Sequence, residues 1–284
     1  MKKILITGCT GTMGSTLIQM LLKDENNRIY GISRDEQKQR EMIKHPRLST
    51  RIGDVRDAAS VARMCPHSID VIYHLAALKC VDTLQHQPDE AVATNILGTQ
   101  NILDIADSFG ARLIFASTDK ACYPINVYGQ TKAIAENMVL NRGQIVCRYG
   151  NVIGSRGSFI QSLTDSLLNE GKAYVTDERM TRFWMSSKQV AEFLIESEHA
   201  MKGTLQIPGG IKSSTIIDFV DAVANCLNVN AYETKIIGVR AGEKLHETLC
   251  TAEEKELIVS SDTDRQFDLL QLNTFIRNVI KGDQ

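Results

Sequence analysis

Two short stretches in the middle of the chain carry the side chains best suited to chemistry. Thr118, Asp119 and Lys120 stand together, and Tyr128 and Lys132 follow four residues apart. Residues at this spacing share one face of a helix, so an ammonium group beside the phenol would lower its pKa from the reference value of about 10. Thr118 can hydrogen-bond the same reacting hydroxyl. The set predicts removal of a hydroxyl proton while a hydride passes to a nicotinamide.

Asp119 and Lys120 add chemistry that simple alcohol oxidation does not need. A carboxylic acid beside an amine can serve as proton donor and proton acceptor, and such a pair can eliminate water next to a carbonyl. To act as a base, Lys120 must be neutral, so its reference pKa of about 10.4 would have to be lowered, for example by burial. A surface ion pair at the end of a strand is the alternative.

A glycine-rich turn near the N-terminus predicts where a dinucleotide would bind. Gly8, Gly11 and Gly14 form a GxxGxxG pattern between an apolar run and a helix. Glycines permit a tight turn and close approach of the backbone to a pyrophosphate, which the N–H groups of the helix attract. An ordinary strand-to-helix corner is the alternative. The residues expected to contact the cofactor here are Thr7, Gly8, Thr10, Gly11, Thr12, Met13 and Gly14.

The residues after the second expected strand bear on the choice between NAD and NADP. An acidic residue here usually holds the ribose 2′-hydroxyl of NAD, whereas an arginine accommodates the 2′-phosphate of NADP. Arg34 precedes Asp35, Ser33 can donate a hydrogen bond, and Lys38 lies one turn further on. This balance predicts NADP as the cofactor, with a solvated, charged helix start as the alternative.

Further cofactor contacts are expected at the ends of the next strands. Asp54 is placed to contact the adenine amino group, and the small residues Ala76 and Ala77 let the backbone approach the cofactor. The neighbouring His74 is expected to be a packed strand residue. The contacts predicted in this part of the site are Asp54, Val55, Leu75, Ala76, Ala77, Lys79, Asn95, Tyr128 and Lys132.

Hydrophobic patterning indicates the elements that must position these residues. Short apolar runs alternate with amphipathic segments through the first half of the chain, which predicts βαβ units and an α/β Rossmann fold with a doubly wound parallel sheet. We expect strands at 3–7, 28–33, 49–53, 70–75, 112–117 and 144–149, and helices at 14–23, 89–108 and 126–141. The predicted NADP-binding core spans 1–153, with a return segment near 177–210.

The pattern changes after about residue 150. It predicts helices at 158–170, 183–200 and 215–227, and short strands near 205–207 and 235–239. Residues 154–176 and 211–284 are therefore expected to form a smaller, mostly helical, discontinuous substrate-binding lobe.

Composition narrows the classes of partner. The 284 residues are 43% hydrophobic and carry a net charge of -2 with no dense basic run, which argues against nucleic acid or an anionic membrane as the main partner. No apolar run is long enough for a transmembrane helix, and the opening MKKILITG predicts a strand instead of a signal peptide. Seven scattered cysteines without a CxxC pair predict neither a disulfide framework nor a metal site, and the expected setting is a reducing cytoplasm.

Several motifs together resemble those of the inverting UDP-N-acetylglucosamine 4,6-dehydratases. These enzymes form a polysaccharide-biosynthesis branch of the extended short-chain dehydrogenases/reductases, and they initiate pathways to pseudaminic acid and related sugars. The resemblance runs from the glycine turn to about Glu247. The matching runs are STDKA at 117–121, PINVYGQTK at 124–132, RYGNVIGSRGS at 148–158, MTRFW at 180–184 and RAGEKLHE at 240–247.

The resemblance implies a lyase that uses NADP without net oxidation. Tyr128, helped by Lys132 and Thr118, would take the proton of the sugar 4-hydroxyl as hydride leaves C4. Lys120 would remove the C5 proton, and Asp119 would protonate the departing 6-hydroxyl. Return of the hydride to C6, with reprotonation of C5 from the opposite face, would give an inverted 4-keto-6-deoxy sugar.

The resemblance also implies a UDP-sugar site and an assembly. Arg240 suits a diphosphate, because a guanidinium donates paired hydrogen bonds to phosphate, and Glu243 could accept bonds from the ribose; a surface salt bridge between these two residues is the alternative. The helical faces of 89–108 and 126–141 resemble those that pair in homo-oligomers of this superfamily. The implied substrate-binding residues are Lys79, Asn151, Arg182, Arg240 and Glu243.

Departures from the family pattern leave the sugar and the C5 stereochemistry open. Cys80-Val81-Asp82 stands where the family commonly has His-Val-Pro, and Cys122 places a thiol two residues after Lys120. A related UDP-sugar 5,6-dehydratase, a C5-epimerase and a 4-keto reductase are competing interpretations of the same core. A non-catalytic NADP-sensing protein is a more distant one.

Overall fold

The chain folds into two compact units in the computed structural model, which describes residues 1–63, 65–155, 157–255, 259–263 and 266–281. The first unit comprises Met1–Arg148 and Ala191–Ile207, and the second comprises Tyr149–Val190 and Pro208–Gln284. The segment that returns to the first unit is therefore shorter than the 177–210 expected from the sequence.

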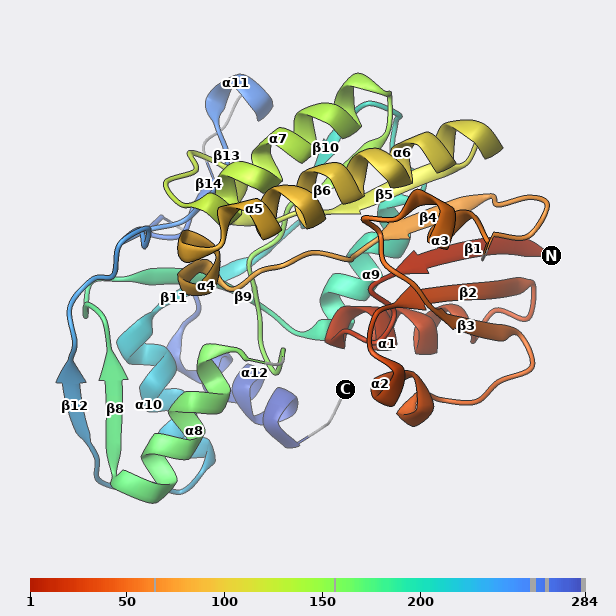
Figure 1. Cartoon of the computed structure of the whole chain (residues 1–284). Helices are drawn as coiled ribbons and strands as arrows, with labels where there is room; N and C mark the ends of the chain where they lie inside the picture. The colour runs from red at the N-terminus through yellow and green to blue at the C-terminus, as the bar shows by residue number, and fades with distance from the viewer. Residues whose placement is uncertain (64, 156, 256–258, 264–265, 282–284) are drawn as a thin grey trace. The chain divides into compact units, whose positions relative to one another are not determined.

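A seven-stranded parallel sheet organises the first unit (Figure 1), in the order β10-β6-β5-β4-β1-β2-β3. Strand β1 lies between β2 and β4, so the chain winds outward in both directions from it. In such sheets ligands bind at the carboxyl ends of the strands beside this switch point. The predicted doubly wound α/β fold is confirmed. The strands are β1 (Lys2–Thr7), β2 (Asn27–Ser33), β3 (Leu48–Ile52), β4 (Val71–His74), β5 (Arg112–Ala116), β6 (Ile145–Cys147) and β10 (Leu205–Gln206).

The helices of the first unit follow the expected pattern with one interruption. The segment predicted as a single helix at 89–108 contains a π-helical turn, η1 (Val92–Leu97), between α5 (Pro88–Ala91) and α6 (Gly98–Phe109). The other helical elements are α1 (Thr12–Leu21), α2 (Glu36–Glu41), α3 (Ala58–Ala62), α4 (Val81–His86), the 3₁₀ turn η2 (Asp119–Ala121), α7 (Val127–Asn141) and α9 (Ser187–Ser197), which crosses the division between the units.

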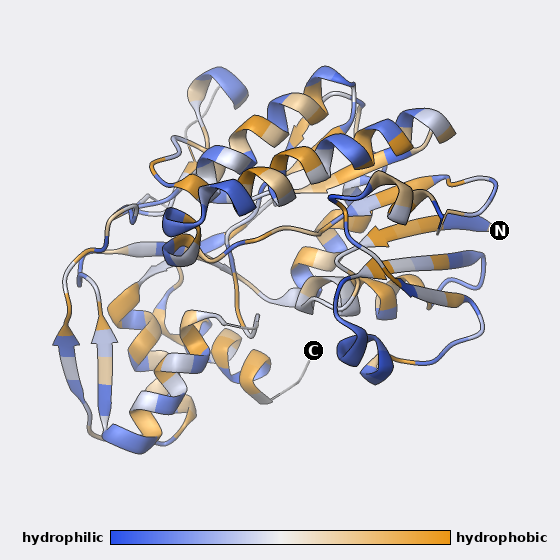
Figure 2. Ribbon diagram, in the orientation of Figure 1, coloured by the Kyte–Doolittle hydropathy of each residue, from blue (hydrophilic) through white to orange (hydrophobic). Residues whose placement is uncertain are grey.

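The central strands are apolar on both faces because helices cover both. Ile4, Leu5 and Ile6 of β1 are fully buried, and Figure 2 colours the middle of this strand as hydrophobic. Helices α3, α6 and α7 cover one face of the sheet, and α1 and α9 lie on the other (Figure 1). Two-sided burial explains why these strands appear in the sequence as continuous apolar runs.

The second unit combines helices with small sheets. Strands β7 (Asn151–Val152), β9 (Thr181–Met185) and β11 (Lys212–Thr215) form one sheet, β8 (Lys172–Val175) pairs with β12 (Glu233–Ile236), and β13 (Thr248–Cys250) pairs with β14 (Val259–Ser260). The helices are α8 (Phe159–Glu170), α10 (Ile216–Cys226), α11 (Ala252–Lys255) and α12 (Leu269–Lys281). The lobe is mostly helical, as predicted, with more strands than the sequence indicates.

The helix predicted at 183–200 is wrong at its start. Phe183 and Trp184 belong to β9, and the helix begins only at Ser187. The Trp184 ring stacks on Phe219 with 3.9 Å between centroids, and its Nε1 donates to Ser214 Oγ at 2.9 Å. A short apolar run does not distinguish a buried strand from a buried helix turn, and these tertiary contacts decide for the strand.

Candidate active site

The glycine turn is built from close backbone contacts that no side chain could enter. Gly8 has a φ of +70°, and a Cβ atom on it would lie 2.9 Å from the amide nitrogen of Ala76. A Cβ on Gly14 would lie 2.4 Å from the carbonyl oxygen of Gly8. The first turn of α1 is thereby pressed against the end of β1, as a pyrophosphate-binding turn requires.

The N-terminus of α1 fits the phosphates of a dinucleotide. Gly11 caps the helix without a side-chain hydrogen bond, and the first turn contains no acidic residue. The N–H groups of such a helix start and the positive end of the helix dipole attract an anion. Gly11, Thr12 and Met13 are at least partly exposed here, whereas Thr10 is buried.

A chain of buried hydrogen bonds runs behind the turn. Thr7 Oγ1 lies 2.7 Å from His74 Nδ1, and His74 Nε2 lies 3.1 Å from Thr99 Oγ1. The Thr99 hydroxyl donates its proton to the carbonyl oxygen of Asn95 at 2.7 Å, so His74 Nε2 must be the donor in the bond to Thr99. His74 Nδ1 then accepts from Thr7, and the ring is neutral. Burial, together with the charge of Lys132, lowers the pKa of His74 to about 3.

Thr7 and Asn95 therefore use their side chains on the protein itself. Thr7 Oγ1 also accepts from the amides of Leu75 and Ala76, both at 3.1 Å. Asn95 is buried in η1 and brackets Leu78, accepting from its N–H at 2.9 Å and donating to its carbonyl at 3.0 Å. Their side chains fix the loop after β4, in which Ala77 is partly exposed and Lys79 is exposed.

The end of β2 presents one exposed cation and a neutralised carboxylate. Asp35 caps α2 by accepting from the Lys38 amide at 2.9 Å, and its carboxylate also forms an ion pair with the Lys38 ammonium. Arg34 is exposed, and within the described part of the chain its guanidinium has no hydrogen bond or ion pair. Gln39 donates to Ser33 Oγ at 2.8 Å and fixes the buried Ser33 in place.

In the loop after β3, Asp54 is held by Arg56. This carboxylate accepts from Arg56 Nε at 2.9 Å and from Nη2 at 2.7 Å. Burial acts to raise the Asp54 pKa, but the hydrogen bonds and charge of Arg56 outweigh it and lower the pKa overall. Val55 is buried against Gly98, where a Cβ would lie 2.8 Å from the Val55 Cγ2.

Thr118, Asp119 and Lys120 form one contact cluster at the end of β5. The Thr118 hydroxyl donates to Asp119 Oδ1 at 2.9 Å, and Lys120 Nζ donates to the same oxygen at 3.0 Å. The Asp119 side chain is fully buried and that of Lys120 is 20% exposed. Asp119 and Lys120 therefore form an ion pair, as the alternative interpretation of the sequence has it. This pair is largely buried at the carboxyl end of β5 and does not lie on an open surface. A proton can pass between these two groups without rearrangement of the backbone.

Helix α7 brings Tyr128 to this cluster. Asn126 caps the helix by accepting from the Gly129 amide at 2.7 Å. A Cβ on Gly129 would lie only 2.2 Å from the carbonyl oxygen of Lys120. The absence of a side chain at Gly129 therefore allows the first turn of α7 to pack directly on the turn that carries Lys120.

Lys120 also acts electrostatically on Tyr128. Burial raises the pKa of Tyr128 to about 12, while the charge of Lys120 and a hydrogen bond with Thr118 act to lower it. Lys132, four residues away on the same helix, is buried; its ammonium donates to the carbonyl of Ala116 at 2.7 Å. The charge of Lys120 therefore favours the Tyr128 phenolate, and the role of Lys132 beside it stays a prediction.

Lys132 lies in an apolar environment. Its Nζ is 3.7 Å from the centroid of the Phe115 ring. Burial lowers the pKa of Lys132 to about 7, and the charge of Glu136 acts in the opposite direction. The protonation of this amine near neutral pH therefore depends on its neighbours.

The substrate residues expected in the second unit fall into a strand pair and a loop. Asn151 is in β7, and Arg182 is in β9 beside it. Arg182 is buried and donates to the carbonyl oxygens of Thr181, Leu245 and Lys244 at 2.7, 3.0 and 2.9 Å, so it joins β9 to the loop that follows Glu243.

Arg240 and Glu243 do not form the surface salt bridge considered from the sequence. Within the described chain, the hydrogen bonds between these two residues involve backbone groups. Glu243 Oε2 accepts from the Arg240 amide at 3.4 Å, and the Glu243 amide donates to the Arg240 carbonyl at 3.1 Å. The Arg240 side chain is exposed. Its guanidinium is therefore accessible to an anionic ligand.

Several residues that shape the site are not evident from the sequence. The sequence signal for these residues is weak because each acts through a contact with a distant segment. Examples are Gln39, Thr99, Gly129, Glu136 and Arg148.

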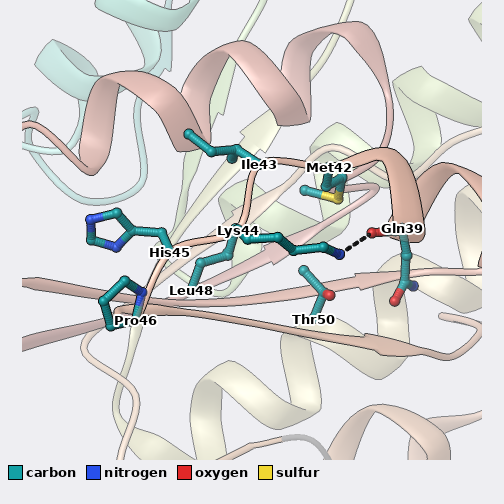
Figure 3. A pocket seen from close by; sticks show the side chains of 8 residues that line it. All are labelled: Gln39, Met42, Ile43, Lys44, His45, Pro46, Leu48 and Thr50. Atoms are coloured by element: carbon teal, nitrogen blue, oxygen red, sulfur yellow. Dashed lines mark hydrogen bonds between the residues drawn. The ribbon is translucent and has the colours of Figure 1, made fainter.

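A cavity of about 370 Å³ beside α2, shown in Figure 3, contains none of the predicted site residues. Its lining residues are Gln39, Met42, Ile43, Lys44, His45, Pro46, Leu48 and Thr50.

Residues 4–267 match the model of a family described as polysaccharide biosynthesis protein. The chain belongs to this family. It is 39% identical over 272 residues to a UDP-N-acetylglucosamine 4,6-dehydratase (inverting) of Campylobacter jejuni subsp. jejuni serotype O:2, covering 90% of this chain and 79% of that relative. It is 36% identical over 271 residues to a UDP-glucose 4-epimerase of Rickettsia felis, covering 89% of this chain and 79% of the relative.

Solved structures agree with the fold of this family. Pen from Bacillus thuringiensis is 28% identical with a TM-score of 0.90, covering 98% of this chain and 97% of that chain. The dTDP-glucose 4,6-dehydratase DesIV from Streptomyces venezuelae, solved with NAD and TYD bound, is 20% identical with a TM-score of 0.79, covering 97% and 96%. At that identity the likeness concerns the fold alone.

The described residues show no sign of a membrane span, a metal site or a disulfide. No described helix is long and apolar enough to cross a membrane. No group of three or more described His, Cys, Asp or Glu residues is arranged to hold a metal ion. None of the seven cysteines, all of which are described, forms a disulfide.

Proposed function

We propose that the protein is a UDP-N-acetylglucosamine 4,6-dehydratase that inverts C5. The observation that carries the proposal is the cluster of Thr118, Asp119, Lys120 and Tyr128, because it joins a base for alcohol oxidation to a buried acid–amine pair. A simple dehydrogenase has no use for the second pair. The name and 39% identity of the Campylobacter relative support the same reaction.

Each residue of the cluster has a separate proton to move. Tyr128 takes the proton of the sugar 4-hydroxyl, with Thr118 and the ammonium groups of Lys132 and Lys120 favouring its phenolate. Lys120 then removes the C5 proton, which the adjacent 4-keto group acidifies, and Asp119 gives a proton to the 6-hydroxyl as it leaves. The 3.0 Å contact between Lys120 and Asp119 allows the proton to be shared between these steps. A bound nicotinamide would accept the hydride from C4 and return it to C6, while C5 takes a solvent-derived proton from the opposite face.

We propose NADP as the cofactor. The carboxylate that could hold the ribose of NAD is Asp35, and it is already used by α2 and Lys38. Arg34 is exposed at the end of β2, where the 2′-phosphate of NADP would require a cation. The glycine turn and the N-terminus of α1 supply the pyrophosphate contacts of either dinucleotide.

For the UDP-sugar we propose contacts with Lys79, Asn151, Arg182, Arg240 and Glu243. The exposed guanidinium of Arg240 supports a diphosphate contact, since it can donate paired hydrogen bonds. Arg182 acts largely through the backbone of residues 244 and 245, because those carbonyls already receive its donors.

We also propose a homo-oligomeric, cytoplasmic enzyme. Exposed Val92 and Leu97 on η1 and Ile134 on α7 support an association through these helices. The absence of disulfides among the cysteines supports a reducing setting. Pseudaminic acid synthesis is the pathway that this product would serve.

Incubation with UDP-N-acetylglucosamine in deuterated water, followed by proton NMR, tests the reaction. We expect a 4-keto-6-deoxy product with deuterium at C5 and inverted configuration, formed without added NADPH. An unchanged 6-hydroxymethyl group with inversion at C4 would indicate the epimerase named for the Rickettsia relative.

Three different products would replace the proposed reaction by a related one. A 5,6-ene would indicate a 5,6-dehydratase, and a C5-epimerised sugar that keeps its 6-hydroxyl would indicate a C5-epimerase. Turnover that occurs only with added NADPH would indicate a 4-keto reductase. Cofactor binding without turnover on any UDP-sugar would indicate a non-catalytic NADP sensor.

A further inference from the structure

A buried ion pair lies one helical turn beyond Lys132 and has no part in the chemistry proposed above. Glu136 on α7 and Arg148, directly after β6, have side chains that are 4% and 6% exposed. Arg148 Nε lies 2.9 and 3.0 Å from the two carboxylate oxygens of Glu136, and its Nη2 lies 2.6 Å from Oε2. Removing two charges from water costs free energy that their attraction regains only in part, so stability alone does not explain the pair.

The position of the pair on α7 relates it to the catalytic residues. Tyr128, Lys132 and Glu136 follow one another at four-residue intervals and share one face of the helix. The ammonium of Lys132 contacts the carbonyl of Ala116 and the ring of Phe115, and both partners are neutral. The carboxylate of Glu136 is the negative charge that favours protonation of Lys132.

Groups on the other elements around α7 do not replace Glu136. On η2, Asp119 is paired with Lys120; His74 on β4 is neutral; and Arg148 carries a positive charge. The π-turn η1 has no charged residue. The charged and titratable residues of α4, α5 and α6 are exposed or half-exposed, and they are Asp82, His86, Asp89, Glu90, Asp104 and Asp107.

We propose that Glu136, held in place by Arg148, is a positioning residue that keeps the buried Lys132 protonated during catalysis. Arg148 holds the carboxylate in place, and the carboxylate stabilises the Lys132 ammonium on the helix face that also carries Tyr128. This inference rests on the proposed function, because it assumes that the reaction uses Lys132 as an ammonium. Burial lowers the pKa of Lys132 to about 7 even though Glu136 opposes the shift, so loss of this carboxylate would lower the pKa further.

The pH dependence of kcat with UDP-N-acetylglucosamine tests the role of Glu136. Glu136→Gln keeps the size of the side chain and can still accept a hydrogen bond from Arg148, but it removes the charge. Activity that needs a charged Lys132 is lost as pH rises through its pKa, so we expect the alkaline limb to move by about one unit to lower pH. Glu136→Asp, which keeps the charge, should leave the limb near its wild-type position.

Two further variants separate this role from a structural one. Glu198→Gln removes another buried carboxylate of the first unit, one that contacts Lys2 and Tyr73, and it should leave the limb unchanged. The double variant Glu136→Leu, Arg148→Met replaces the ion pair by apolar groups, a change that folded proteins often tolerate, and should shift the limb as Glu136→Gln does.

The outcomes distinguish this inference from the proposed function. A wild-type protein that forms no 4-keto-6-deoxy product contradicts the proposed function. Wild-type turnover with an unmoved alkaline limb in either folded charge-removal variant contradicts the role of Glu136 alone. An equal shift in Glu198→Gln also contradicts it, because a general loss of packing would then account for the change.

Discussion

Lys120 acts on both proton-transfer groups of the proposed reaction, Asp119 by contact and Tyr128 through its charge. Its ammonium lies 3.0 Å from Asp119 and its charge favours the Tyr128 phenolate. When Lys120 gives up its proton to become the C5 base, this support for the phenolate disappears. The phenol then retains the proton that it took from the 4-hydroxyl, so the order of the two steps follows from one charge.

Replacing Lys120 should separate the two steps. In Lys120→Ala we expect deuterium exchange at C5 to fall by at least about a hundredfold, the scale of a lost general base, while NADP binding stays at the wild-type level. Loss of the positive charge should also raise the pKa of Tyr128, so transient NADPH formation should require a higher pH. Lys120→Arg is the matched control, because it restores a charge near Tyr128 but supplies no base. Wild-type exchange in either variant would exclude Lys120 as the base.

The choice of cofactor should depend on Arg34. Replacement by alanine removes the exposed guanidinium proposed to meet the 2′-phosphate, so affinity for NADP should fall roughly ten- to hundredfold and affinity for NAD should change little. Calorimetric titration with both dinucleotides measures the two constants. Arg40→Ala removes an exposed arginine from the same helical region, paired with Glu36, and serves as the control. Equal losses for NADP and NAD would argue against recognition of the 2′-phosphate.

The sequence predicts the reactive residues better than their partners. Spacing along a helix places Tyr128 and Lys132 on one face, but it does not indicate how deeply each side chain is buried. Lys132 turns toward Phe115 and the Ala116 carbonyl, and the charge of Lys120, on a separate turn, also acts on Tyr128. Asp35 is similar, since only the structure reveals that its carboxylate caps α2.

At the scale of elements, the active cluster depends on how closely α7 packs on η2. Gly129 is the contact point, and a Cβ there would lie 2.2 Å from a backbone oxygen that no side-chain rotation can move. We expect Gly129→Ala to lower stability by about 1–3 kcal/mol and to reduce kcat, because α7 and Tyr128 must shift away from Lys120.

Thermal unfolding and turnover of Gly129→Ala test this packing. Gly209→Ala is the control, because a Cβ on Gly209 would meet no atom within 4 Å and its backbone φ is not positive. A Gly129→Ala protein with unchanged Tm and kcat would contradict the close-packing argument.

Most elements of the first unit are predictable, whereas the small sheets of the second are not. Strands β1, β4, β5 and β6 are largely apolar because helices cover both faces, and that burial is visible in the sequence itself. Strand β9 is apolar in the same way, but its neighbours β7 and β11 come from segments about 30 residues away on either side. Local pattern carries no information about such pairing, so it predicts a helix where Phe183 and Trp184 form a strand.

At the scale of the whole chain, the two units offer separate reporters of stability. The single tryptophan, Trp184, is buried in the second unit, whereas the neutral His74 is buried in β4 of the first. The amides of β4 can be followed by hydrogen exchange. Hydrogen exchange of the β4 amides therefore measures how pH changes the stability of the first unit around His74.

Acid should weaken the first unit through His74. The folded-state pKa of about 3 lies below the reference value of about 6.5, so between these values the unfolded chain binds a proton that the folded unit does not. The stabilisation is complete above about pH 6.5 and declines as pH falls toward 3, by up to about 1.4 kcal/mol per pH unit.

Hydrogen exchange of the β4 amides in two variants tests this prediction. In His74→Gln these amides should lose the pH dependence and be less protected at pH 7. In His199→Gln, which changes an exposed histidine, the pH dependence should remain. Trp184 fluorescence during urea unfolding reports whether the second unit follows the same slope. Parallel pH curves for wild type and His74→Gln at β4 would exclude a neutral, buried His74.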